Sequence, residues 1–334
     1  MANVRDTGVS HIHSFANSLY HSFTLRSLLW GTHTISNSIM RILIFGLLLL
    51  MASACKLTLP GVDQAEFADP VITPIAPGLI DEASGIVDSR SQPGNLWVQE
   101  DSGNPAELTL LGHDGKLKGR ISVPRFLNTD WEELANGPGP QDGVNYLYIG
   151  DIGNNDGNRG VVQIYRLPEP TSLQTPITQV DRFNFRYPDG PRDAEAMFVD
   201  PATKDIYIIS KREPNNTRLY RLRYPQNRDE TATAEALGEM PSFGQGLPAY
   251  VTGAAISSDG SELIVRTYSN LFYWKRKDGQ SIADALQKGT SRTIPYRLEP
   301  QGEAVCFNKD GRGYFTLSER STAASVNLYY YPKK

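Results

Sequence analysis

The sequence predicts an all-β protein, specifically a β-propeller built from four-stranded blades. Three observations carry this prediction: similar segments recur at a nearly regular spacing, short apolar strands follow each segment, and Asp-Gly turns separate the strands. The chain has 334 residues, of which 40% are hydrophobic and 21% charged. Its 29 glycines, 22 prolines and 16 tyrosines favour turns and strands over long helices.

Five similar openings define the repeat. They start at Glu82, Glu132, Glu195, Ala254 and Glu303, with spacings of 50, 63, 59 and 49 residues. A period of this size indicates stacked or radial units of one supersecondary motif. Each opening is expected to form the first strand of a unit, and two or three further apolar strands follow it. We therefore count five blades, whereas six blades fit if one of the longer spacings hides a further opening.

Turn residues and the chain ends indicate how the ring forms. Seven Asp-Gly pairs mark tight turns, because glycine readily adopts a positive φ. The last unit, residues 303–331, contains only three strands. An N-terminal strand within residues 66–79 would complete that unit and remove its open edge, so that residues 66–334 form one propeller domain. One short helix is expected, at residues 281–288.

The N-terminal segment predicts export. Met40 and Arg41 precede ten apolar residues, 42–51, which are too few to span a membrane but suit a signal peptide. Ala52 and Ala54 then allow cleavage before Cys55. We expect Cys55 to be lipidated and to anchor the protein in a bacterial cell envelope. The alternative is a soluble secreted or periplasmic protein.

The same pattern divides the first 65 residues into three parts. Residues 1–39 are interpreted as an over-long gene start or an extended leader, because a complete signal peptide follows them. Residues 40–54 are the predicted signal peptide. Residues 55–65 are the predicted tether between the membrane and the propeller.

Composition argues against several classes of function. The formal net charge is −4 and no basic block occurs, which disfavours a nucleic-acid partner bound through its phosphates. Four of the five histidines precede residue 55, so His113, in a turn sequence, is alone in the predicted domain. A histidine-rich metal site is therefore excluded. Cys306 lies in an apolar strand, and no disulfide with Cys55 is expected.

Acidic residues recur at the openings and predict a site at one end of the channel. The first strands should surround the channel, and residues two positions apart share a strand face. The candidate metal ligands are Glu82, Glu132, Glu195, Glu303, Asp130, Asp193 and Asp151. Converging carboxylates repel one another unless a cation neutralises them, and oxygen ligands favour calcium or magnesium. A structural interpretation stays open, in which each carboxylate accepts backbone N–H groups or pairs with a nearby cation.

Loops and strand ends around these acids form a candidate ligand rim. Its members are Asp101, Asn154, Asn155, Lys211, Arg266 and Glu319. The loop 150–159 is rich in glycine and short oxygen-bearing side chains but lacks the spacing of an EF-hand. Residues 101–104 resemble it in the first unit. Repetition of such loops on one face of a rigid scaffold is typical of a ligand-binding rim.

Three motifs carry a resemblance to a known family. They are DWEELA at 130–135, YIGDIGNN at 148–155 and RDAEA at 192–196. Together they resemble a bacterial family of exported propeller proteins whose members are mostly named hypothetical proteins or lipoproteins. The resemblance covers most of 80–334 and implies a propeller fold without implying an activity. The short acidic openings are more distantly similar to phytase-like and other calcium-associated propellers.

Three functions fit these observations. The first is an exported binding module for an unknown small molecule or protein, tethered to a membrane through Cys55. The alternative is a calcium- or magnesium-dependent hydrolase of phosphoesters or lactones, with Lys211 or Arg266 as an anion clamp. A third, a glycosidase, rests on fold analogy alone. Metal-dependent turnover would indicate the hydrolase, and turnover that survives chelation would indicate the glycosidase.

Overall fold

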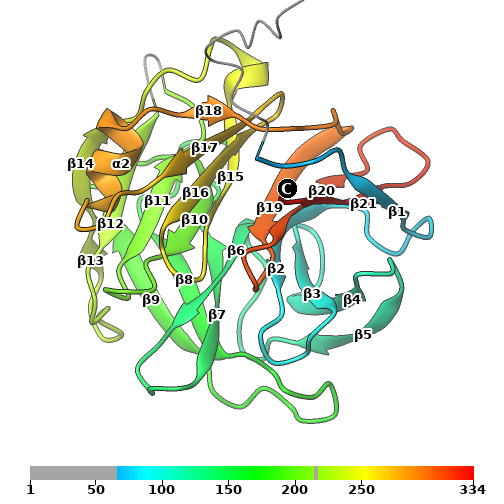
Figure 1. The fold of residues 1–334 in the computed structure, drawn as a ribbon. Helices are drawn as coiled ribbons and strands as arrows, with labels where there is room; N and C mark the ends of the chain where they lie inside the picture. The colour runs from blue at the N-terminus through cyan, green and yellow to red at the C-terminus, as the bar shows by residue number, and fades with distance from the viewer. Residues whose placement is uncertain (1–65, 214–216) are drawn as a thin grey trace, which may run out of the picture. The chain divides into compact units, whose positions relative to one another are not determined.

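The computed structural model describes residues 66–213 and 217–334, which form five antiparallel sheets arranged as a ring (Figure 1). The predicted five-bladed propeller is therefore confirmed. The signal peptide, the tether and Cys55 lie outside the described residues. Within the described part of the chain, no helix combines the length and the apolar character needed to cross a bilayer.

Blades are numbered in chain order, and the strands of each blade are given from the innermost to the outermost. Blade 1 contains β2 (Ala83–Asp88), β3 (Asn95–Glu100), β4 (Glu107–Gly112) and β5 (Leu117–Ser122). Blade 2 contains β6 (Trp131–Pro138), β7 (Asn145–Asp151), β8 (Val162–Pro168) and β9 (Asp181–Arg186). Blade 3 contains β10 (Ala194–Val199), β11 (Ile206–Ser210), β12 (Arg218–Leu222) and β14 (Glu235–Glu239).

The last two blades follow the same plan. Blade 4 contains β15 (Val251–Ile256), β16 (Glu262–Thr267), β17 (Leu271–Lys275) and β18 (Arg292–Thr293). Blade 5 contains β19 (Gln301–Phe307), β20 (Gly313–Glu319), β21 (Asn327–Pro332) and β1 (Val71–Pro74). The inner strands β2, β6, β10, β15 and β19 each contact the next around the ring, and β19 contacts β2. They therefore surround one channel.

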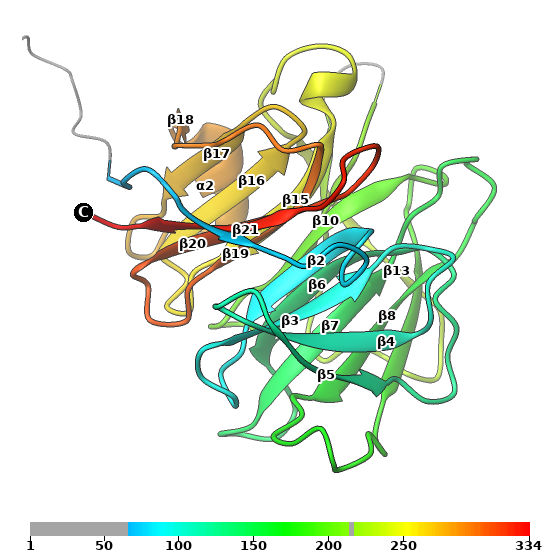
Figure 2. The ribbon, with the colours of Figure 1, turned by 90° about the vertical axis from the view of Figure 1, so that its right-hand side faces the viewer.

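The N-terminal strand closes the ring, as the three-stranded last unit predicts. Strand β1 pairs antiparallel with β21, and Figures 1 and 2 show the two side by side. Phe67 continues this contact through a bridge to Lys333 and is 1% exposed. Its ring centre lies 5.5 Å from that of Tyr273 and 4.9 Å from that of Tyr314. The first described residues thus fasten blade 5 and pack against blade 4.

The core consists of five clusters of buried apolar side chains, one between each pair of neighbouring blades. Successive side chains of an inner strand pack alternately against the two neighbouring blades. Met197 packs towards blade 2, whereas Ala196 and Phe198 pack towards blade 4. This period of two explains why the inner strands are almost continuously apolar: both of their faces are buried.

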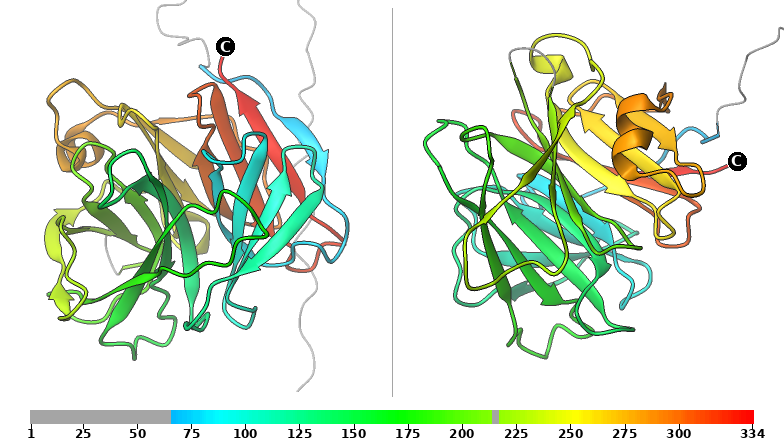
Figure 3. Two further views of the ribbon diagram at one scale, coloured as in Figure 1. Left: turned by 90° about the horizontal axis from the view of Figure 1, so that it is seen from below. Right: turned by 90° about the vertical axis from the view of Figure 1, so that its left-hand side faces the viewer.

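Two connections depart from the simple repeat. The short helix α2 (Ile282–Lys288) lies on the outer part of blade 4, as Figure 3 shows, and Ser281 caps it by accepting the N–H of Asp284. The sequence predicts this helix correctly. It does not predict β13 (Ala232–Thr233), which leaves blade 3 and pairs parallel with β9 of blade 2. Two residues are too few to give a periodic signal.

Candidate functional site

The mouth of the channel is the end at which the inner strands begin. In every blade the first residues of the inner strand pair with the last residues of the second strand, as in Trp131 with Asp151 and Gln301 with Glu319. The pairing register shifts near this end in all five blades. Each inner strand therefore carries a β-bulge at the mouth, a feature that re-aims side chains and is frequent beside functional sites.

The bulged residues form the inner ring of the mouth. The register skips Ser84, Glu132, Glu195, Thr252 and Glu303 in blades 1 to 5. Blade 1 therefore offers Ser84 at this position, whereas the sequence alignment expected Glu82. Glu82 lies two residues earlier, where it bridges to Glu319 of blade 5 and its Oε2 accepts a hydrogen bond of 2.7 Å from Asn104.

Three carboxylates come together on the side of blades 1 and 2. One oxygen each of Asp101, Asp130 and Glu132 can lie within 4.8 Å of the other two. Asp101 follows the end of β3, Asp130 directly precedes β6, and Glu132 is the bulged residue of β6. The sequence placed Asp130 and Glu132 among the metal ligands and Asp101 on the rim. The structure brings all three to one point, which we name the carboxylate trio.

Glu132 is the unusual member of the trio. Its side chain is 2% exposed, and it has no hydrogen bond or ion pair within the described residues. Burial raises the pKa of Glu132 well above its usual value, and the neighbouring acids Asp101 and Glu303 raise it further, although the charge of Lys211 opposes the shift. An isolated buried carboxylate is costly unless a proton or a cation neutralises it.

The rest of the trio is also electrostatically strained. Burial raises the pKa of Asp101 to about 6, with further contributions from Glu303, Asp130 and Glu82. Burial likewise raises the pKa of Asp130, although Arg159 opposes the shift. Three acids with raised pKa values at one point favour either shared protons or a bound cation.

Gly153 packs directly against the carboxylates of Glu132 and Asp130. A Cβ atom at this position would lie 2.3 Å from Oε1 of Glu132 and 2.5 Å from Oδ2 of Asp130. The φ of Gly153 is not positive, so space and not backbone conformation requires glycine here. The loop after β7, predicted as part of the rim, therefore contributes to the site mainly by leaving room for the two carboxylates.

A second acidic pair lies on the side of blade 5. Gln301 donates through Nε2 to both Glu303 and Glu319, and the Tyr268 hydroxyl donates to Glu303 over 3.2 Å. Burial and the adjacent Glu303 raise the pKa of Glu319 to about 9. Tyr268 and Gln301 are site residues that the sequence did not indicate, because neither carries a charge or stands in an opening motif.

Glu133 lies directly beneath the mouth and crosses the channel. Its Oε2 accepts the N–H of Ala254 in blade 4 over 2.9 Å, and its Oε1 accepts the N–H of Leu134 over 3.1 Å. Glu133 is fully buried, and burial raises its pKa well above the usual value. At a bulge two consecutive residues oppose one partner, so both Glu132 and Glu133 are buried here. Glu133 thus fits the structural interpretation that the sequence left open.

Three other predicted ligands already have partners of opposite charge. Asp151 is buried and bonds Arg159 at 2.7 Å and Gln163 at 2.6 Å. Asp193 pairs with Arg212 at 3.1 Å and also accepts the N–H of Asn154 at 2.8 Å. Glu195 pairs with Lys211, leaving its Oε2 buried without a hydrogen-bond partner. These acids position loops and cations around the trio and do not join it.

The remaining predicted rim residues are Asn154 and Asn155, in the loop after β7, and Arg266, in β16. Asn155 is exposed and accepts a hydrogen bond from Arg212, whereas Asn154 is buried and holds its own loop together through Arg159. Arg266 is fully buried, where it bonds Glu299 and Tyr296 between blades 4 and 5. Its guanidinium therefore cannot reach a ligand at the rim. The sequence could not show this, because Glu299 lies 33 residues away.

The opposite end of the channel is apolar. A cavity of about 30 Å³ is surrounded there by the second halves of the inner strands, including Leu134, Phe198 and Phe307. Nearby, the buried carboxylate of Asp88 accepts hydrogen bonds from His113 and Asn308, each 2.8 Å long. The bond from Asn308 joins blade 5 to blade 1, whereas the bond from His113 lies within blade 1. His113 is therefore tied to the end of the propeller that lies away from the mouth.

These features define a class of protein: a five-bladed β-propeller with a carboxylate-rich mouth and an apolar opposite end. No family profile matches the chain, and no curated protein sequence matches it. Two solved structures, both named glucose dehydrogenase, are similar at 11% and 10% identity with TM-scores of 0.47 and 0.46. Each likeness covers 78% of this chain and 98% or 99% of the other. Likeness at this level carries no argument about activity.

Proposed function

We propose that this chain is an exported binding module whose mouth holds a calcium or magnesium ion and, through that ion, an oxygen-rich ligand. The observation that carries the proposal is Glu132, a buried carboxylate that has no hydrogen bond or ion pair among residues 66–213 and 217–334 and stands beside Asp101 and Asp130. The donor set fits a hard cation, because it consists of carboxylate oxygens and contains no histidine or cysteine.

The charged groups around the trio favour neutralisation by a bound cation over neutralisation by shared protons alone. Glu82 and Glu303 lie at the same mouth, and the pKa of Asp101 is raised by burial first and then by Glu303, Asp130 and Glu82. The charges of Lys211 and Arg159 act on Glu132 and Asp130, but both cations are already paired, Lys211 with Glu195 and Arg159 with Asp151. Gly153 leaves space directly against the two carboxylates of Glu132 and Asp130. A divalent ion at the trio would relieve the repulsion that these contacts leave.

Export and a lipid anchor at Cys55 are part of the proposal. They are supported by the signal-peptide pattern of residues 40–54 and by the resemblance of the three motifs to exported bacterial propellers. The described chain enters the fold at Phe67, beside Lys333 and therefore at the apolar end. A soluble periplasmic or secreted form is the alternative.

A metal-dependent hydrolase is the second candidate, and one observation favours it. The pKa of Asp101 is raised to about 6, which suits a general base that works near neutral pH. In this role a cation held by Asp130 and Glu132 would leave Asp101 to accept a proton from water. Turnover of phosphoester or lactone substrates that EDTA abolishes would establish this activity over binding alone.

The decisive experiment measures thermal unfolding of the purified protein with calcium, with magnesium and with EDTA. At one hundred times its Kd a cation adds about 2.7 kcal/mol, which raises Tm by roughly 5 °C or more. The substitution Gly153→Ala should abolish the rise without removing any charge, because its methyl group meets Glu132 and Asp130.

The matched control is Gly160→Ala in the same loop. A Cβ there meets nothing within 4 Å, and φ is not positive. This variant should keep the full cation shift. A protein whose Tm does not respond to either cation would leave the acidic mouth as a structural device and would defeat the proposal.

A further inference from the structure

The face of the propeller that surrounds the mouth carries exposed leucines. Leu127, Leu298 and Leu247 are 79%, 74% and 63% exposed, which makes them the most exposed large apolar side chains of the described residues. Each lies in a different connection from the outermost strand of one blade to the innermost strand of the next. Because the inner strands begin at the mouth, these connections reach the mouth face. We name the three side chains the leucine rim.

Hydrogen bonds hold two of these connections against the mouth. Asn128, next to Leu127, donates its side-chain amide to the carbonyl of Asp101 over 2.7 Å. In the connection from β18 to β19, the Tyr296 hydroxyl donates to the carbonyl of Tyr268 over 3.2 Å. Asp101 belongs to the carboxylate trio, and Tyr268 bonds the acidic pair of blade 5. Both connections therefore lie beside the acidic mouth.

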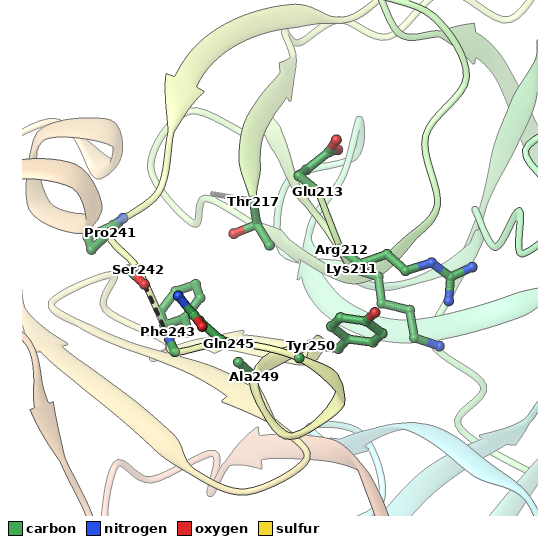
Figure 4. A pocket seen from close by; sticks show the side chains of 12 residues that line it. Lys211, Arg212, Glu213, Thr217, Pro241, Ser242, Phe243, Gln245, Ala249 and Tyr250 are labelled. Carbon is green, nitrogen blue, oxygen red and sulfur yellow. Dashed lines mark hydrogen bonds between the residues drawn. The ribbon is translucent and has the colours of Figure 1, made fainter. Parts of the chain in front are cut away.

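The third connection, from β14 to β15, also lies at the mouth. Figure 4 shows its residue Tyr250 near Lys211 and Arg212, and the Arg212 guanidinium lies 5.8 Å from the centre of the Tyr250 ring. Lys211 in turn pairs with Glu195, the bulged residue of blade 3. Leu247 therefore belongs to the same face as the other two leucines of the rim.

The loops at the other end of the propeller are polar in comparison. The hairpin loops after the inner strands of blades 2, 4 and 5 turn at Asp142, Asp259 and Asp310, each followed by a glycine. Leu117, at the start of β5 on that side, is only 38% exposed. A single exposed apolar residue needs no explanation, whereas three highly exposed leucines on one face indicate a contact surface.

The centre of the leucine-bearing face is acidic. Asp101 and Asp130 are half-buried and Glu82 is exposed, so these carboxylates reach the surface, and the buried Glu132 adjoins them in the trio. A positively charged group of a partner would neutralise them. Apolar contacts around such a group exclude water from it, which strengthens the central ion pairs and is the usual arrangement at the centre of a protein interface.

We propose that this face docks a protein segment that places a lysine or arginine side chain against the carboxylate trio and packs apolar side chains against the leucine rim. Charge complementarity selects this partner over a lipid membrane, because the acidic mouth repels anionic headgroups. The inference goes beyond the proposed function and does not require the cation. A basic side chain and a divalent cation would neutralise the same carboxylates, so calcium should compete with the partner.

The test is selection from a phage-displayed library of random peptides on the purified protein in EDTA. The enriched sequences are expected to combine lysine or arginine with apolar residues, and fluorescence anisotropy then gives the Kd of an enriched peptide. Asp130→Asn should weaken its binding about tenfold through the loss of one charge contact. Leu127→Ser combined with Leu298→Ser should also weaken it about tenfold through lost apolar contacts.

The matched control is Leu117→Ser at the other end of the propeller, which should leave the Kd unchanged. Leu127→Ser and Leu298→Ser should not change Tm, because both side chains are mostly exposed. The inference fails if no peptide is enriched, if the enriched peptides lack basic residues, or if the double variant binds them equally. Vesicles of phosphatidylcholine and phosphatidylglycerol that sediment the protein but not the double variant would assign the rim to a membrane and overturn the inference.

The cation and the partner are tested separately. Binding of a basic peptide by a protein whose Tm ignores calcium and magnesium would support the docking surface and refute the cation. A Tm rise with calcium without enrichment of basic peptides would support the cation and refute the docking surface. Peptide binding that is unchanged by a calcium concentration that raises Tm would show that the partner does not use the trio, contrary to the inference.

Discussion

The mouth of the channel and its opposite end are built from the two halves of the same five inner strands. At the mouth each inner strand has a bulge. In three of the five blades the bulged residue is a glutamate, namely Glu132, Glu195 or Glu303. Beyond the bulge the strands alternate regularly and enclose an apolar cavity of about 30 Å³. The difference shows that one irregular residue per strand separates the part of a blade that carries chemistry from the part that packs.

Glu132 and Glu133 show the same contrast within one strand. Both are buried and both have raised pKa values. Glu133 accepts backbone N–H groups from Leu134 and Ala254 and thereby joins blade 2 to blade 4, whereas Glu132 has no partner among the described residues. The fold satisfies Glu133 with backbone N–H groups, and Glu132 is the carboxylate to which we assign the cation.

The largest effect is expected from removing the satisfied carboxylate. Glu133→Ala leaves buried N–H groups of blades 2 and 4 without an acceptor and should lower the free energy of unfolding by about 3 kcal/mol. Urea denaturation measures this loss. Glu133→Gln keeps one acceptor oxygen and should lose less. A loss below about 0.5 kcal/mol for the alanine variant would contradict the role of Glu133 as a tie between blades.

The pH dependence of stability should distinguish the mouth from the rest of the protein. The folded-state pKa values of Asp101, about 6, and Glu319, about 9, lie above their usual values of 3.8 and 4.5, so the folded protein binds more protons than the unfolded chain. In EDTA the free energy of unfolding should therefore fall by about 5 kcal/mol between about pH 5 and pH 8, and Glu319 accounts for most of the fall.

A bound cation should remove the part of this pH dependence that comes from Asp101, because it replaces the protons on the trio. In saturating calcium the fall should therefore be smaller by about 1 kcal/mol, and the part due to Glu319 should remain. Equal slopes with calcium and with EDTA would show that the cation does not bind at these acids. The variant Glu319→Gln is the control, and it should reduce the slope in EDTA.

A smaller effect of opposite sign is expected from Glu132→Gln. In EDTA the substitution removes a buried acid without breaking any hydrogen bond and should stabilise the protein by about 1 kcal/mol. It should also abolish the rise of Tm with calcium. Differential scanning calorimetry measures both quantities, and a destabilised variant would mean that Glu132 has a structural partner.

The smallest effect is expected at the apolar end. Cys306 is buried in β19 and burial raises the pKa of its thiol well above the usual value, so the side chain acts there as a small apolar group. Cys306→Ala should cost less than about 1 kcal/mol through the small volume lost. The Tm shift with calcium should not change. A lost shift would show that the two ends of the channel are coupled.

Much of the fold could be predicted because it depends on local pattern. The spacing of the openings predicts five blades, and the missing strand of the last unit predicts β1 beside β21. The capping residue Ser281 and the residues after it predict α2. Each of these signals is a property of neighbouring residues, such as a period of two, a turn or a helix cap.

Which residues form the site depends on tertiary contacts, and the spacing of motifs along the sequence does not reveal these contacts. The sequence favours Glu82 as the blade 1 member of the ring, but the bulge places Ser84 there. It groups Asp151 and Asp193 with Asp130, although Arg159 and Arg212 neutralise them. Tyr268 and Gln301 carry no charge or motif, so only their positions around the mouth give them a role.

The sequence by itself determined the number of blades, the strand that closes the ring and the concentration of acids at the openings. The tertiary structure alone decided which acids meet, which are paired and which one is left without a partner. The physical reason is distance. Strand and turn preferences act over a few residues, whereas the charge state of Glu132 depends on Asp101, Asp130 and Glu303, which three different blades bring together.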